Sequence, residues 1–335
     1  LSLNEEETKE LLMHLWELGT TYHYYYFLTK NCSYQILTAI EAVKPSLKII
    51  DKLPFWIIPS DTVHAIFEID GLVTDVSFRP SIRRKFDHGL KALEGEEIAL
   101  FEDLVQSNQL ATLSKSQQSD ATKAKAINAY SDYLEYNYQQ ELNDKESKQG
   151  QLKYQVLLSR SQLQATSSKK NIIPRQDEHP EKGHKSARFT IGLGESRLFG
   201  NTLYLEQRFA LHDELDATDG YPKNGKIEFM NIGAEFSEEK DFTIKHIDIV
   251  SVSALNPMSR YEKKASWQMR FGIQEDRISQ CEKCTNAFFD LGIGYSISLD
   301  TNKDYIIFGL IYNTLEYSTR FNKNNHRYQI GPKAG

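Results

Sequence analysis

The residue best suited to chemistry in this sequence is Cys32, which ends the aromatic run YHYYYFLTKNC. Asn31 precedes an apolar pattern of helical spacing and is therefore predicted to cap a helix that stops before Pro45. Cys32 then lies in the first turn, where unpaired backbone amides and the helix dipole stabilise a thiolate. We therefore assign Cys32 and Asn31 to a candidate catalytic site. The alternative is that Cys32 is a small buried hydrophobe, which is the common role of a lone cysteine.

A thiolate nucleophile also needs a general base, and no histidine offers one with defined geometry. His23 lies within the aromatic run, which is most simply interpreted as part of the core. His14 is expected to pack near the apolar side of the first helix, and His64 follows the turn PSDTV as a possible neighbour of the thiol.

The other two cysteines form the close pair Cys281-Glu282-Lys283-Cys284, which we expect in a turn between two strands. Three interpretations are open: a short disulfide, half of a zinc site, or a redox motif. A zinc site would need two more ligands nearby, and a redox motif would open a helix after a strand. We favour a disulfide in an oxidising compartment and expect neither a metal nor a cofactor.

Composition excludes several classes of partner. The net charge is −6 and no long basic block is present, so nucleic acid is not expected as a partner. No run of about 18 apolar residues occurs, which excludes a membrane-spanning helix but leaves a β-barrel possible. The sequence does not predict an oligomeric state.

The first part of the chain, residues 1–163, has mostly helical periodicity. Leu11, Leu15 and Leu18 recur on one face after an acidic first turn, and Gly19 ends the pattern. Further helices are predicted from Pro59 to about Phe67, after Ser81, from about Gly95 to Gln106, and as one long helix over residues 120–160. The charged stretch DKESKQGQ is the weak point of that last helix.

Residues 164–187 mix Ser, Pro, Lys and Gly without periodicity and are predicted to be a linker. Beyond it, over residues 188–335, the period becomes two in about seven or eight segments. The clearest runs from Ala287 to Leu299, where apolar residues alternate with Gly, Ser and Asp. A soluble antiparallel domain and an outer-membrane barrel both give this pattern, and the small second face favours the barrel. The predicted fold class is α+β: a largely helical, partial thiol-enzyme domain before an antiparallel β meander belonging to an outer-membrane-type β-barrel.

The stretches LSLNEEETKELLMHLWEL, YHYYYFLTKNCSY, FWIIPSDTV and RPS together resemble the Lnb-like N-terminal periplasmic domain family, of the bacterial lipoprotein N-acyltransferase type. The Asn-Cys step at a helix start is also similar to that of the permuted papain-like thiol enzymes. The region from GHKSARFTIGLGESRLFGN to YLEQRFALHDELDATDGY resembles the C-terminal barrel-like domain that accompanies this periplasmic domain.

The resemblance implies that Cys32 attacks an ester or amide carbonyl and passes the acyl group to an amine or to water. The implied substrate is a lipid or lipoprotein, and the implied location is the cell envelope, with the periplasm-facing domain anchored at the outer membrane. In such families the base is a histidine in a Gly-His segment upstream of the cysteine, which this sequence lacks. Gly183-His184 and His212-Asp213 lie downstream, and we interpret His212-Asp213 as a feature of the β domain near an interface or loop.

We expect the chain to be a fragment, truncated at both ends and inactive without the upstream histidine. Two alternatives to a thiol acyltransferase or hydrolase remain open. One is a non-enzymatic outer-membrane protein with a periplasmic plug or docking module. The other is an intracellular helical protein with a β-sandwich, in which Cys281 and Cys284 would be reduced.

Overall fold

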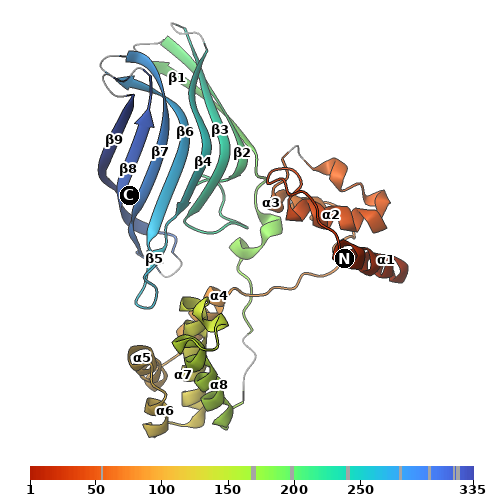
Figure 1. The fold of residues 1–335 in the computed structure, drawn as a ribbon, viewed down its shortest axis with the longest axis vertical. Helices are drawn as coiled ribbons and strands as arrows, with labels where there is room; N and C mark the ends of the chain where they lie inside the picture. The colour runs from red at the N-terminus through yellow and green to blue at the C-terminus, as the bar shows by residue number, and fades with distance from the viewer. Residues whose placement is uncertain are drawn as a thin grey trace. The chain divides into compact units, whose positions relative to one another are not determined.

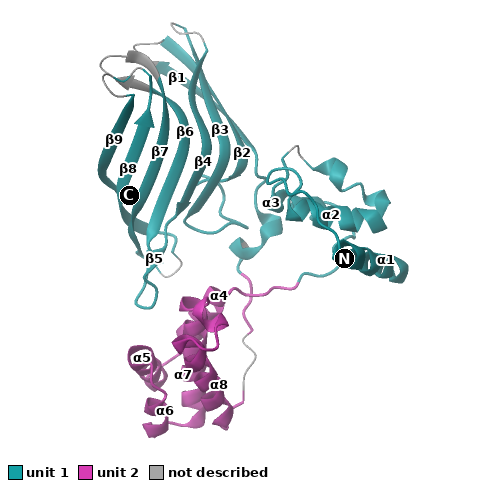
Figure 2. Ribbon diagram, viewed as in Figure 1, with its two compact units in different colours: residues 1–76, 175–335 teal, residues 77–174 magenta. Residues whose placement is uncertain are grey.

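The computed structural model describes residues 1–53, 56–166, 171–196, 200–238, 242–278, 281–300, 303–319, 321 and 325–335. Two compact units divide the chain: residues 1–76 with 175–335, and residues 77–174 (Figure 2). The boundaries fall within the predicted helical part, 1–163, and within the predicted linker, 164–187.

The first unit begins with three helices and two short 3-10 helices. Their starts follow from local capping: Asn4 and Glu7 form a reciprocal capping box, and Asn31 caps the second helix as predicted. Pro59 occupies the first position of the third helix, where its missing N–H costs nothing. The helices are α1 (Glu5–Leu18), α2 (Cys32–Val43), η1 (Pro45–Leu47), η2 (Ile50–Lys52) and α3 (Pro59–Phe67).

The second unit is helical. Its core gathers Phe101, Tyr130 and Leu134, which are fully buried. Among the helices described in either unit, none is both long and apolar enough to cross a membrane. The helices of this unit are α4 (Ile82–Lys91), α5 (Glu96–Ser107), α6 (Ala111–Lys115), α7 (Asp120–Asn137), η3 (Glu141–Asn143) and α8 (Lys148–Gln162).

The prediction of one long helix over residues 120–160 is wrong. The chain leaves α7 at Tyr138, and Ser147 begins α8 by accepting a hydrogen bond from the Gly150 N–H at 2.9 Å. A serine that caps a new helix start competes with continuation of the old helix, and Ser147 lies within the charged stretch DKESKQGQ, the weak point of the predicted helix.

The remainder of the first unit is one curved antiparallel sheet (Figure 1). Its strand order is β1-β2-β3-β4-β6-β7-β8-β9, a meander in which each long strand pairs with its neighbour in sequence, while β5 pairs with β7 in parallel. No pairing joins β1 to β9 among the described residues, so the sheet is open there. Two 3-10 helices, η4 (Gln176–Glu178) and η5 (Pro180–Lys182), precede the strands. The strands are β1 (Arg188–Ser196), β2 (Gly200–His212), β3 (Gly225–Ser237), β4 (Thr243–Ala254), β5 (Pro257–Met258), β6 (Ser266–Ile278), β7 (Cys281–Ser298), β8 (Ile306–Tyr317) and β9 (His326–Ala334).

The sheet buries its polar face and exposes its apolar face. Lys333 of β9 donates to Gln268 of β6 at 2.8 Å, across the two strands that separate them, so the polar face is the concave one. On that face Arg270 donates two hydrogen bonds to Asp248, at 3.0 and 2.8 Å. The opposite, convex face carries exposed apolar side chains: Trp267, Phe271, Ile273, Phe289, Ile293, Tyr295, Ile297, Ile307, Ile311, Leu315, Tyr317, Tyr328 and Ile330. We call this set the apolar sheet face.

The aromatic run before Cys32 is not core, which corrects the interpretation from the sequence. Tyr22, Tyr24 and Tyr25 are exposed, while the Phe27 ring lies edge-on to Phe229 of β3, with ring centroids 5.7 Å apart. The apolar face of α1 is exposed as well, with Trp16 at 83%. The run is an extended segment followed by a turn, which closes in a bridge between Tyr26 and Lys30. Because it does not continue a helix, its rings are not gathered on one helical face that could be buried.

Candidate functional site

Cys32 is the first residue of α2, and its side chain is exposed. Asn31, directly before it, is buried and uses its whole amide internally. Its nitrogen donates to the carbonyls of Ile57 at 2.6 Å and Phe27 at 3.2 Å, and its oxygen accepts from the Tyr34 N–H and the Ser33 hydroxyl. Asn31 therefore fixes where α2 starts and where Cys32 is presented. Its predicted catalytic role stays a prediction, because this geometry shows only a cap.

The three histidines considered as neighbours of the thiol lie on α1, in the aromatic run and on α3. His14 faces Glu17 on α1 at 3.9 Å, and His23 is exposed. His64 lies on α3, and its Nε2 is buried without a hydrogen-bond partner among the described residues. No described side chain hydrogen-bonds the Cys32 sulfur. None of these three histidines is hydrogen-bonded to Cys32.

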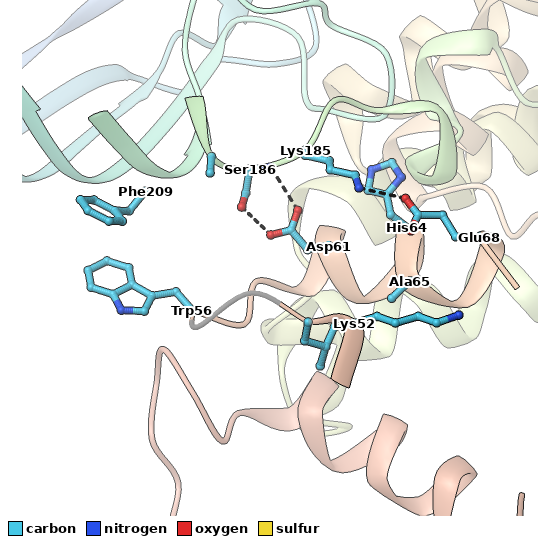
Figure 3. A pocket seen from close by; sticks show the side chains of 11 residues that line it. Lys52, Trp56, Asp61, His64, Ala65, Glu68, Lys185, Ser186 and Phe209 are labelled. Atoms are coloured by element: carbon cyan, nitrogen blue, oxygen red, sulfur yellow. Dashed lines mark hydrogen bonds and ion pairs between the residues drawn. The ribbon is translucent and has the colours of Figure 1, made fainter. Parts of the chain in front are cut away.

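A pocket of about 390 Å³ lies between α3 and the start of the sheet (Figure 3). Trp56 and Phe209 form its apolar wall, with ring centroids 4.9 Å apart. At its other end Lys185 pairs with Glu68 at 2.9 Å, and His64 lies beside them. Cys32 is not among the residues that line it. The pocket thus combines an apolar wall with charged groups, which suits an amphiphilic ligand.

The pocket floor is held by a buried contact between α3 and the chain entering β1. Asp61 accepts two hydrogen bonds from Ser186, one from its N–H at 3.0 Å and one from its hydroxyl at 2.5 Å. Next to it, the Tyr221 hydroxyl donates to the His184 carbonyl at 3.0 Å and contacts Ser60 of α3 at 3.3 Å. The helical segment and the sheet are therefore joined by polar contacts between residues more than 120 positions apart.

The two downstream histidines meet at this junction, although the sequence alone did not bring them together. His184 Nε2 lies 3.0 Å from His212 Nδ1, and both rings stack on Tyr221. The signal was present in the hairpin: extending the β1–β2 register four residues beyond the pair Arg188 and Arg208 places His184 opposite His212. The interpretation of His212 as a β-domain residue near an interface agrees with this position.

The second cysteine pair begins β7, with Cys281 opposite Ile278 and Cys284 opposite Asp276 in the backbone register. The side chains of both cysteines lie outside the described residues, so the predicted disulfide stays a prediction.

The chain thus combines a helical segment presenting a cysteine at a helix start, a separate helical unit, and an antiparallel sheet with a polar concave face. Comparison with known families divides it in the same way. Residues 1–68 match the Lnb N-terminal periplasmic domain, residues 76–172 match a domain of unknown function (DUF7842), and residues 177–335 match another (DUF7840). No curated protein and no solved structure matches the chain. The first match indicates a protein of the cell envelope with a periplasmic domain.

Proposed function

We propose that this protein is a cell-envelope thiol enzyme that transfers or hydrolyses acyl groups of lipids or lipoproteins. The observation that carries the proposal is the exposed Cys32 at the first position of α2, held there by the buried cap Asn31. A sulfur in this position is open to a substrate and lies in the first turn of a helix, beside backbone amides that have no partner within the helix. The match of residues 1–68 to a periplasmic domain family supports the cell-envelope setting.

The proposed reaction has two steps. Cys32 loses its proton to a base, and its sulfur attacks an ester or amide carbonyl to form a C–S bond. The C–O or C–N bond then breaks, and the alcohol or amine leaves with the proton that the base returns. The resulting thioester is then attacked by an amine, which completes a transfer, or by water, which completes a hydrolysis. The pocket beside Trp56 and Phe209 supports an acyl substrate because its wall is apolar and its far end is charged.

The apolar sheet face supports a location at a membrane. A sheet in water buries its apolar side, whereas here the buried side carries ion pairs and amides and the exposed side carries Ile, Phe, Trp and Tyr. Outer-membrane sheets have this arrangement, with lipid in contact with the apolar side. We propose that the sheet belongs to an outer-membrane-type β-barrel that anchors the periplasmic domain.

The test is labelling of the protein with an acyl-directed thiol probe in membranes. We expect a single labelled site, lost in Cys32→Ser and kept in the double variant Cys281→Ser/Cys284→Ser. The acyl group should be released by hydroxylamine, as a thioester is. An active protein in which Cys32 carries no acyl group at any time would rule out the mechanism.

A second function is favoured by one specific observation, the exposed aromatic surface of the N-terminal segment. Trp16 is 83% exposed and Tyr22 is 91% exposed, and apolar side chains exposed together mark interaction surfaces. In this alternative the protein is a non-enzymatic outer-membrane protein whose helical part docks another molecule. This alternative predicts that Cys32→Ala preserves the cellular phenotype and that Trp16→Ala with Tyr22→Ala abolishes it. The proposed enzymatic function predicts instead that Cys32→Ala abolishes the phenotype.

A further inference from the structure

Three side chains at the junction between α3 and the sheet point their ligand atoms at one another. His184 Nε2 lies 3.0 Å from His212 Nδ1 and 3.6 Å from Asp216 Oδ2, and His212 Nδ1 lies 3.9 Å from the same oxygen. A point equidistant from these three atoms is about 2 Å from each, which is the length of a zinc–nitrogen or zinc–oxygen bond. The spacing of the three ligand atoms therefore already suits a metal ion.

The hydrogen bonds of His184 leave the correct nitrogen available. His184 Nδ1 lies 2.7 Å from the Lys185 carbonyl, an acceptor, so this nitrogen carries the ring hydrogen and donates it. Its Nε2 therefore carries a lone pair directed at the cluster, where it accepts from His212 Nδ1. A second ring nitrogen that donates to a backbone carbonyl is the usual way in which proteins orient a metal-binding histidine.

The third group is a carboxylate that its neighbours hold in place. Asp216 Oδ2 accepts hydrogen bonds from Arg208 and from the Asp213 N–H. Arg188 also pairs with Asp213 and Asp216, so two guanidinium groups and two carboxylates balance one another around the histidines. An added cation therefore meets no net positive charge from these four groups.

We propose that His184, His212 and Asp216 bind a zinc ion, which fastens the chain entering β1 to the end of β2. Without metal, the hydrogen on His212 Nδ1 bridges to His184 Nε2. On binding, that hydrogen moves to His212 Nε2, the two rings turn in their own planes on Tyr221, and the two nitrogens separate by about 0.3 Å to the spacing of tetrahedral ligands. Three protein ligands leave the fourth position to water.

The position of the cluster gives the ion a structural role. Tyr221, on which both imidazoles stack, also contacts Ser60 of α3, and Ser186, two residues after His184, holds Asp61 of α3. An ion here would restrain the few residues that enter β1, which contact α3. This role is independent of Cys32 and of any acyl transfer.

The experiment uses the full chain without a polyhistidine tag, in a Cys281→Ser/Cys284→Ser background, because a thiol pair is itself a zinc ligand set. Zinc affinity is measured by competition with a chromophoric chelator, and cobalt substitution reports coordination in the visible spectrum. We expect one ion per chain with a tetrahedral cobalt spectrum. His184→Gln should lower zinc affinity by about 100-fold or more, since even the loss of an outer hydrogen bond costs about 10- to 100-fold. His326→Gln, an exposed histidine of β9, is the matched control and should leave it unchanged.

A second measurement uses the protein with His184 and His212 unchanged, so its result does not depend on whether the variants fold. Zinc should protect His184, whose side chain is 22% exposed, from acylation by diethyl pyrocarbonate, while the exposed His326 stays reactive. Absence of stoichiometric zinc binding, or binding that does not protect His184, would overturn the proposal and leave the pair bridged only by a proton.

Discussion

The carboxylate of Asp61 in α3 accepts both polar hydrogens of Ser186, the N–H and the hydroxyl, in a contact where both residues are buried. The two residues are 125 positions apart, and Asp61 belongs to the segment that matches a periplasmic domain while Ser186 belongs to the region that continues into the sheet. A second contact between the same elements, Lys185 with Glu68, is exposed. The two contacts differ in burial and therefore in strength.

We predict that Asp61→Ala loosens this junction. The Ser186 N–H loses its acceptor in a buried place, which costs about 1–3 kcal/mol. Hydrogen–deuterium exchange of the segment around Ser186 should become faster. Glu68→Ala is the control and should leave that exchange unchanged, because exposed ion pairs contribute little. Equal acceleration in both variants would mean that the junction depends on charge in general and not on the buried contact.

A second prediction concerns the cap that presents the thiol. Asn31→Asp keeps an oxygen for the Tyr34 N–H but loses the donors to the Phe27 and Ile57 carbonyls. We expect Asn31→Asp to retain α2 yet to destabilise the unit by about 1–3 kcal/mol, mainly because the Ile57 carbonyl is left unpaired in a buried place. Asn31→Ala should cost more, since it removes the cap as well.

The measurement for Asn31 is chemical unfolding, combined with the rate at which Cys32 reacts with a maleimide. Ser33→Ala is the control, because Ser33 only donates to Asn31 and does not hold the Ile57 carbonyl. If Asn31→Asp were as stable as the parent, the contacts of the amide nitrogen would have no energetic role.

Helix starts could be predicted from the sequence because their chemistry is local. Asn31 begins α2 and Ser81 begins α4, each by accepting a hydrogen bond from an N–H three residues ahead. Local chemistry also explains the failure over residues 120–160, where Ser147 starts a new helix that periodicity alone did not reveal.

The sequence predicted that residues along each strand alternate between two faces, but it did not predict which face is buried. A period of two assigns Phe289 and Ile293 to one face and Asp290 and Ser296 to the other, whichever of them is buried. Which face is buried depends on the curvature of the sheet, which brings Gln268 and Lys333 together. That curvature depends on all the strands together. The meeting of His184 with His212 likewise needed the hairpin register, and the contact of Asp61 with Ser186 needed the complete fold.

The pocket gives a third prediction, that it takes up an acyl chain. The chain has three tryptophans, and Trp56 is the one that lines the pocket. In a Trp16→Phe/Trp267→Phe background, titration with a fatty acid brominated along its chain should quench Trp56 fluorescence to saturation. Ala65→Leu, which adds volume to the pocket lining, should weaken this binding. Quenching that never saturates, or that Ala65→Leu does not affect, would show that the acyl chain binds elsewhere.

The last prediction tests whether the apolar sheet face lies against lipid. Ile293 of β7 is 52% exposed and lies between Trp267 of β6 and Ile311 of β8. In lipid, Ile293→Lys places a charge on the hydrocarbon side of the sheet, and a lysine near the middle of a bilayer costs about 2–4 kcal/mol. In water the same exposed substitution would cost within about 0.5 kcal/mol. The two environments therefore predict different outcomes for one variant.

The control is Leu215→Lys, because Leu215 is 89% exposed but lies after β2, outside the strands. Unfolding by urea is followed for the parent and both variants in phospholipid vesicles. We expect Ile293→Lys to lose about 2–4 kcal/mol and Leu215→Lys to stay near the parent. A small effect in both would place the sheet in water and remove the membrane anchor from the proposed function. In that case the exposed isoleucines and aromatics would need a protein partner to cover them, because an apolar surface of this extent is unfavourable in water.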